Sequence, residues 1–210
     1  MSEKKSNPRQ IVRFMNNKVL LAFQDNMQVE TGENASAIHN QYSKVRMTLM
    51  DYSQGKGTKA VIVNCNMDID TVKYIAETIL NGVAVDFKES KILSYKKDDT
   101  GKSPVIHVNI KYCTDEKTGQ PLSSPWMFSV ANGNGIADQT QTGGTVCRKG
   151  SYKKIGEVKV YMSEADCFKT LITVRDYIRN FEIVNFASLM KARAAYEESV
   201  KEQTEKESEE

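Results

Sequence analysis

Alternation of hydrophobic and polar residues predicts a series of β-strands in the first part of the chain. The clearest is 44–50, where Val45, Met47 and Leu49 recur at the period of a half-buried strand. Apolar runs at 11–14 and 18–23 flank Asn16-Asn17, a pair that favours a hairpin turn. A fourth strand is predicted at 59–63, and the polar segment 25–41 is predicted to be a loop.

The period then lengthens, which predicts a helix over 71–80. Val72, Ile75 and Ile79 fall on one face of that helix and form an apolar stripe. Either Asp68 or Asp70 is suited to cap its N-terminus, and Asn81-Gly82 is suited to end it because both residue types tolerate positive φ.

The second half of the chain repeats this plan. Strands are predicted at 91–97, 105–113, 126–130 and 157–162, and 132–153 is predicted to be a long loop with one short strand near Val146. Ser163 caps a second helix, whose apolar pattern continues, after a bend near Asn180, into an acidic end.

These patterns predict an α+β fold of two pseudo-repeated units, each of about four antiparallel strands followed by a helix. The two helix starts align at a spacing of 96 residues, with Asp70 on Asp166 and Ile75 on Leu171. We expect a flexible N-terminus at 1–9, one domain over 10–196 with halves 10–82 and 83–196, a long C-terminal helix, and a disordered acidic tail at 197–210.

Charge is unevenly distributed and indicates a polyanionic partner. The chain carries a net charge of +2, but 197–210 alone carries −5, which leaves +7 on the rest. No apolar run approaches the length that spans a bilayer, and the first residues lack the apolar core of a signal peptide. We expect a cytoplasmic protein with reduced cysteines.

Motifs of catalysis and cofactor binding are weak. Gly55-Lys56-Gly57-Thr58 lacks the earlier glycine of a phosphate loop, and Gly133-Asn134-Gly135 is followed by Asp138 where a dinucleotide fingerprint needs its third glycine. The four cysteines form no close pair, so no zinc site is expected. The sequence therefore favours a binding protein over an enzyme, with no cofactor and no metal.

Cations interleaved with aromatic residues provide the candidate site. Phosphates are expected to meet basic residues, and unpaired bases to stack on aromatic rings beside hydrogen-bonding side chains on the outward face of the strands. The candidate residues are Arg46, His107, Asn109, Lys111, Trp126, Arg148, Lys149, Tyr152, Lys153, Lys154, Lys159 and Tyr161. For Trp126, which shares a face with Phe128, a place in the core is the alternative to a stacking role.

Two strand-rich units that each end in a helix, with one basic sheet face, resemble the Whirly and PC4-like single-stranded DNA-binding proteins. The resemblance is one of topology over residues 10–190, and it implies self-association through the helices. The acidic end resembles the tails of bacterial and phage single-stranded DNA-binding proteins. We expect single-stranded DNA binding with low sequence specificity, in replication, recombination or transfer of a phage or mobile element. The alternatives are an RNA-binding module, an assembly protein that docks through helix 182–196, and an enzyme with an unrecognised site.

Overall fold

The computed structural model describes residues 9–28, 43–55 and 57–209, with side chains described as far as Lys201. The first half forms a four-stranded antiparallel meander, here called the first sheet, in the order β1-β2-β3-β4. Its strands are β1 (Gln10–Met15), β2 (Val19–Asn26), β3 (Lys44–Asp51) and β4 (Val61–Asp68). A short 3₁₀ turn, η1 (Gly57–Lys59), precedes β4, and helix α1 (Ile69–Leu80) follows it.

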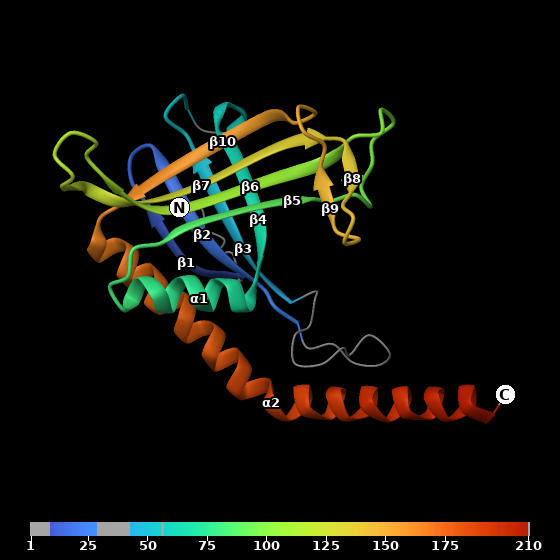
Figure 1. Cartoon of the computed structure of the whole chain (residues 1–210). Helices are drawn as coiled ribbons and strands as arrows, with labels where there is room; N and C mark the ends of the chain where they lie inside the picture. The colour runs from blue at the N-terminus through green and yellow to red at the C-terminus, as the bar shows by residue number, and fades with distance from the viewer. Residues whose placement is uncertain (1–8, 29–42, 56, 210) are drawn as a thin grey trace.

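The second half has the same plan with one insertion. Its four-stranded antiparallel sheet, here called the second sheet, has the order β10-β7-β6-β5. The strands are β5 (Asp86–Ile92), β6 (Ser103–Thr114), β7 (Pro121–Gly135) and β10 (Lys153–Met162). A small hairpin of β8 (Ala137–Gln139) and β9 (Thr145–Cys147) is inserted before β10, and helix α2 (Glu164–Glu209) ends the chain. Figure 1 shows the strands of the two sheets crossing, with α1 and α2 below them.

The predicted α+β class and its two strand-and-helix units are confirmed, but two local predictions were wrong. The fifth strand is 86–92 instead of 91–97, and 93–102 forms turns. The predicted loop 132–153 contains the C-terminal end of β7, as far as Gly135, the strand β8 and the first residue of β10, whereas the short strand predicted near Val146 is confirmed as β9. Residues 1–8, most of the N-terminus expected to be flexible, lie outside the described part. The acidic end continues the backbone of α2, and most of its side chains lie outside the description too.

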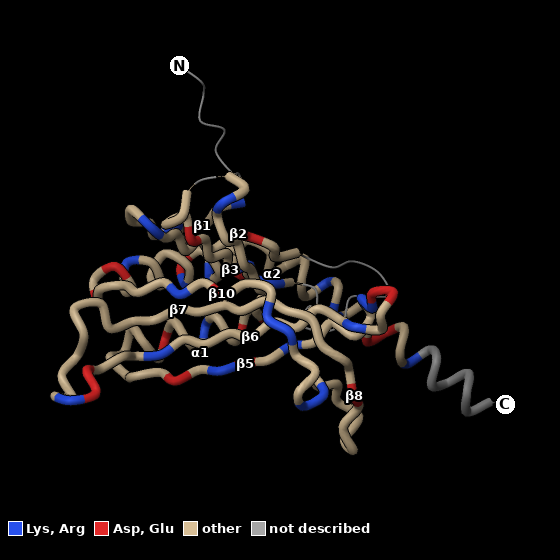
Figure 2. Tube along the Cα trace, turned by 90° about the horizontal axis from the view of Figure 1, so that it is seen from above, with Lys and Arg blue, Asp and Glu red and all other residues tan. Residues whose placement is uncertain are grey.

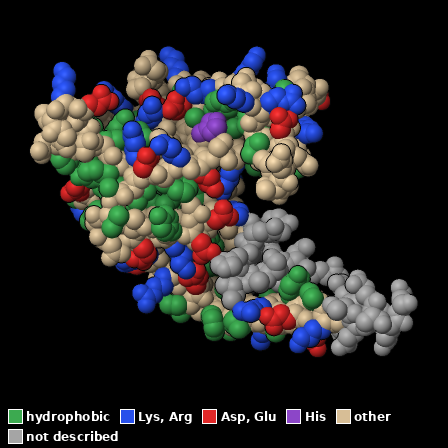
Figure 3. Space-filling view, in the orientation of Figure 1, with side chains coloured by type: hydrophobic (Ala, Val, Ile, Leu, Met, Phe, Trp, Pro, Cys, Tyr) green, Lys and Arg blue, Asp and Glu red, His purple; other side chains and the backbone are tan. Residues whose placement is uncertain are grey.

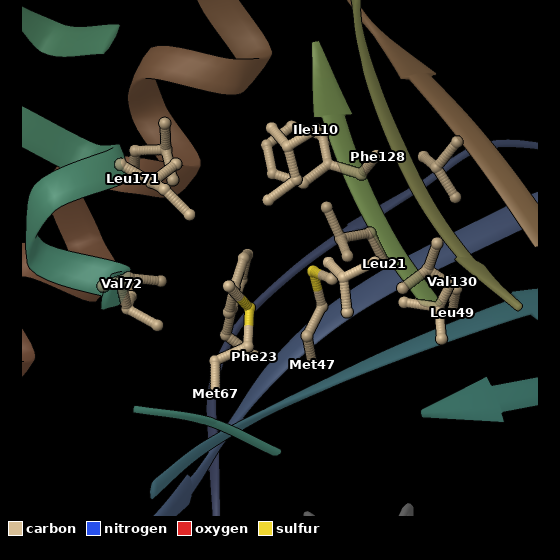
Figure 4. Packing of buried hydrophobic residues seen from close by; sticks show 14 of the residues in the cluster. Leu21, Phe23, Met47, Leu49, Met67, Val72, Ile110, Phe128, Val130 and Leu171 are labelled. Carbon is tan, nitrogen blue, oxygen red and sulfur yellow. The ribbon is translucent and has the colours of Figure 1, made fainter. Parts of the chain in front are cut away.

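One hydrophobic cluster joins both sheets and both helices. Leu21, Met47 and Leu49 of the first sheet face Phe128 and Val130 of the second, and all five are fully buried (Figure 4). Burying each side chain of this size contributes roughly 1.5–3 kcal/mol, so this cluster is the main source of stability. Where β10 crosses β4, Gly156 occupies the inner face, and a Cβ there would lie 3.3 Å from Val61. The absence of a side chain allows the two edge strands to approach.

A chain of ion pairs lies at the other seam between the halves. Asp68, at the junction of β4 and α1, accepts from Lys44 of β3 and from Lys91 of β5, the latter at 3.1 Å. Lys91 also pairs with Glu89 at 3.1 Å. Asp68 occupies the N-cap position of α1 but makes no side-chain capping bond, because its carboxylate is engaged in this network. The acid therefore ties three strands together instead of capping the helix.

Helix α2 begins on the core and then leaves it. Ser163 caps it as predicted, accepting from the backbone N–H of Asp166 at 3.1 Å. Its buried residues end at Ile178, and Figure 1 shows the helix changing direction further along. Beyond that point several large apolar side chains are exposed, among them Ile183 and Phe186 at 63% and 62%. No helix of the described part is long and apolar enough to cross a membrane.

Candidate nucleic-acid interface

The outward side of the second sheet, here called the second-sheet face, brings many of the candidate residues together. His107, Asn109 and Lys111 follow one another along β6, and Lys159 and Tyr161 follow along β10. β7 lies between them and presents Ser129 and Ala131, which are paired in register with Asn109 and His107. These two small side chains are 5% and 9% exposed, so β7 is low at this level between the taller side chains of β6 and β10. At the next outward position Met127, 4% exposed, lies between Lys111 and Tyr161.

Asn109 lies at the centre of this face with an unused acceptor. Its side-chain oxygen is buried and has no hydrogen-bond partner among the described residues. Buried polar atoms in folded proteins are nearly always paired, so an unpaired one at a surface face calls for an explanation. Because this oxygen is enclosed by its neighbours, a ligand on the face would meet the exposed part of the Asn109 side chain and not the oxygen itself.

Tyr152 closes one end of the face. Its ring lies over Gly133, where a Cβ would be only 2.5 Å from the ring, and it meets the ring of His107 edge-on with centroids 4.5 Å apart. The hydroxyl of Tyr152 is buried and unpaired, and this burial raises its pKa. Tyr152 is therefore packed on the sheet, and Tyr161, 42% exposed, is the aromatic ring of this face that is open to stacking.

Carboxylates neutralise part of the positive charge. Glu157 accepts from Lys154 at 2.7 Å and pairs with Lys159 at 3.3 Å. The hydrogen bond from Lys154 outweighs burial and holds the pKa of Glu157 below its usual value. Figure 2 shows blue and red positions interleaved along these strands. Lys111 makes no ion pair among the described residues, although Asp86 of β5 lies opposite it in register and is paired with Lys88 at 2.9 Å. Lys111 is therefore a lysine of this face that is able to receive a phosphate.

The remaining basic candidates are scattered. Arg148 makes a bidentate pair with Asp138 across the base of the β8–β9 hairpin, with Nη2 at 2.8 Å from the carboxylate, which raises the guanidinium pKa and lowers that of Asp138. Lys149 is exposed in the turn that follows. Lys153 pairs with Asn134 and therefore points to the opposite side of β10 from Lys154. The segment 148–154 is thus not one cluster of free cations.

Two candidate residues do not belong to this face. Trp126 points to the inner side of β7, is 3% exposed, and packs edge-on against Tyr112 with centroids 4.9 Å apart. The expectation that Trp126 stacks on a base was wrong, because the alternation along β7 turns it with Phe128 into the core. Arg46 lies on β3 of the first sheet, where its Nε donates to Asn66 at 3.1 Å.

Sequence reasoning missed two residues of the second-sheet face. Glu157 was not singled out, although its position three residues after Lys154 and two before Lys159 was a usable signal. Gly133 falls in the predicted loop 132–153, whereas in the structure it belongs to β7 and leaves room for the Tyr152 ring. No spacing along the chain could have indicated that contact.

Metal and thiol chemistry find little support in the described residues. They contain no group of three histidine, cysteine or acidic side chains placed to hold a metal ion. All four cysteines are free, and burial raises the pKa of both the Cys65 and the Cys167 thiol to about 12. Those two thiols are therefore protonated and unreactive at neutral pH.

Comparisons of the chain with protein-family models, with curated proteins and with solved structures found no match.

Proposed function

We propose that this protein binds single-stranded DNA with low sequence specificity and is a binding protein rather than an enzyme. The observation that carries the proposal is the second-sheet face, where Asn109 and Lys159 flank the low position Ser129 of β7, and Lys111 and Tyr161 flank Met127 beside it. Phosphates would meet the lysines, and bases would lie over Ser129 and Ala131 and stack on Tyr161.

Low sequence specificity follows from the chemistry of this face. Lysines contact phosphates, which are the same at every position, and stacking accepts any base. Only a few hydrogen-bonding side chains, among them Asn109 and Ser129, lie at the centre of the face, which is too little to distinguish a sequence. A role in replication, recombination or transfer of a phage or mobile element, and a cytoplasmic location, belong to the same proposal.

The test is fluorescence anisotropy of a labelled oligothymidine, about 30 nucleotides long, at low and high salt, since such proteins cover roughly 4–16 nucleotides per site. We expect tight binding at low salt that weakens as salt rises. Replacing Lys111 and Lys159 by glutamine should reduce affinity and lower the salt slope by about 1.4, or 0.7 per cation. A matched control replaces Lys97 and Lys117, two exposed lysines in turns. Equal losses in both pairs, or no binding by the parent protein, would contradict the proposal.

RNA is the nearest alternative ligand, because phosphates and base stacking serve both nucleic acids. A competition between DNA and RNA oligomers of the same sequence separates them. A preference for RNA would make the protein an RNA-binding module, with the same face and the same residues as its binding site.

A second function is favoured by a separate observation, the exposed apolar side chains on the far half of α2. Val184 is 80% exposed, and Ile183 and Phe186 are above 60% (Figure 3 shows hydrophobic side chains along this part of the helix). Phe186, Leu189, Arg193, Tyr196 and Val200 recur at alternating spacings of three and four, the pattern of a coiled-coil seam. We propose that this seam mediates homo-oligomer formation. Sedimentation of the chain with Phe186→Glu tests it, and an unchanged mass would remove the proposal.

A further inference from the structure

The outward side of the first sheet, here called the first-sheet face, carries a second pattern. In register across the four strands, Met15, Leu20, Met50 and Ile62 form one row. Met15 and Ile62 are each 53% exposed, which is unusual for a row of four large apolar residues. A pocket of about 620 Å³ opens at this end of the sheet, lined by Met15, Met50, Tyr52 and the Asn16-Asn17 turn.

The next rows of the same face are polar and positively charged. Arg13 projects from β1 and Arg46 from β3, with the small Ala22 and the polar Gln24 of β2 between them. The strands are about 4.8 Å apart, so the two arginines lie roughly 10 Å apart across the sheet. The β4 positions in these rows are Asn64 and Asn66.

Charge distinguishes this face from the second-sheet face. None of the outward residues in these three rows is acidic, and among the described residues neither arginine pairs with a carboxylate. On the second-sheet face, by contrast, Glu157 engages two of the lysines. Arg46 keeps its terminal nitrogens for another ligand, because its one assigned bond uses Nε.

We propose that the first-sheet face is a second contact surface for single-stranded nucleic acid. Phosphates would contact Arg13 and Arg46, and bases would lie on the apolar row that contains Met15 and Met50 and in the pocket beside it. The inference rests on the proposed function and adds a site to it. A single strand presents a charged backbone beside flat, largely apolar bases, and the face presents arginines beside an exposed apolar row. A pocket of this volume lies within the range that holds small planar ligands. A single-stranded nucleic acid that is long enough would contact both sheets of one protein molecule.

Methionine oxidation gives a direct readout of contact in the unaltered protein. Hydrogen peroxide converts exposed methionine to its sulfoxide, and mass spectrometry locates the product. Met15 and Met190 are both exposed, at 53% and 40%, but Met190 lies far along α2. We expect oligothymidine to slow oxidation of Met15 several-fold and to leave Met190 unchanged. Equal rates at Met15 with and without saturating oligonucleotide would overturn the inference. Protection of Met15 that rises with protein concentration alone would assign the row to a second copy of the chain, which also overturns it.

Substitution gives the complementary test. Replacing Arg13 and Arg46 by glutamine should weaken binding of the long oligothymidine roughly tenfold and lower its salt slope by about 1.4. The pair Lys97→Gln and Lys117→Gln again supplies the same change of net charge, and circular dichroism checks the fold of each variant. If the Arg13→Gln and Arg46→Gln variant binds as well as that control, the second surface is refuted. The proposed function still holds in that case, provided that Lys111→Gln and Lys159→Gln weaken binding. If the parent protein does not bind at all, the proposed function fails with it, so the two failures are distinguishable.

Discussion

The side chain of Asn132 completes the edge of a strand in the opposite sheet. Its Oδ1 accepts from the backbone N–H of Asn64 at 3.0 Å, and its Nδ2 donates to the Asn64 carbonyl at 3.2 Å. The carboxamide thus takes the place of a neighbouring strand along part of β4, which would otherwise expose unpaired backbone groups. One residue of β7 both protects that edge and fixes how the two sheets cross.

Replacing Asn132 by alanine should destabilise the fold by about 1–3 kcal/mol, because two backbone groups of β4 lose their partners. Urea denaturation followed by circular dichroism measures the change. Asn134→Ala, two residues further along β7, is the matched control, since Asn134 makes no such bond to β4 among the described contacts. A loss no larger than the control's would show that water replaces the carboxamide without cost.

Replacing Glu157 by glutamine should tighten nucleic-acid binding, the opposite of the lysine variants. Lys154 and Lys159 lose their carboxylate and become available to phosphates. We expect roughly threefold higher affinity at low salt and a salt slope steeper by up to about 0.7 for each freed lysine. Anisotropy titrations measure both. Glu116→Gln, in the β6–β7 turn, makes the same charge change away from the face and should have little effect.

Removing 197–210 should also tighten binding at low salt, because it removes five net negative charges that repel a polyanion. The effect should disappear at high salt, where the Debye length falls well below about 10 Å. A chain of full length with five of its seven C-terminal glutamates changed to glutamine makes the same change of net charge and separates charge from length. If only the truncation has an effect, charge is not the cause.

Acid should weaken the seam at Asp68. Burial alone would raise the pKa of this carboxyl, but the bonds from Lys44 and Lys91 outweigh it and hold the pKa below the usual 3.8. A lowered pKa in the folded state gives stabilisation that is complete above 3.8 and is lost as the pH falls through the lower folded value. Because the Asp68 side chain is about half-exposed and solvent screens its ion pairs, these pairs contribute about 1 kcal/mol or less to the free energy of unfolding. In the Asp68→Asn variant, the free energy of unfolding should change less between about pH 5 and about pH 3 than in the parent protein. Urea unfolding at both pH values measures it.

The parts of the fold that sequence predicted are those with a local cause. The first hairpin followed from Asn16-Asn17, and the Asn16 side chain does accept from the backbone of Lys18 and Val19. The strand at 86–92 was missed because Glu89 and Lys91 share the inner face with Phe87. Lys91 pairs with both Glu89 and Asp68, and these ion pairs make the burial tolerable. No local pattern in the sequence indicates such partners.

The repeat was predicted correctly in kind and wrongly in register. Buried positions on the two helices match at a spacing of 95, with Val72 on Cys167 and Ile79 on Val174, instead of 96. Residue type suggested one alignment, whereas burial gives the other. The candidate site shows the same division. Alternation correctly placed His107, Asn109 and Lys111 on one face, but only packing shows that Tyr152 is held against Gly133 and that Arg148 is paired with Asp138.

The meander order of both sheets has a consequence for how the chain reaches this structure. Apart from the β8–β9 insertion, every strand pairs with its neighbour along the chain, so most pairing requires only short loops to close. Each half is able to assemble its own sheet early, and the slow event becomes the docking of two preformed layers. Before that event β4 has an open edge and the core faces are exposed, so the half-assembled chain is the species most prone to aggregate.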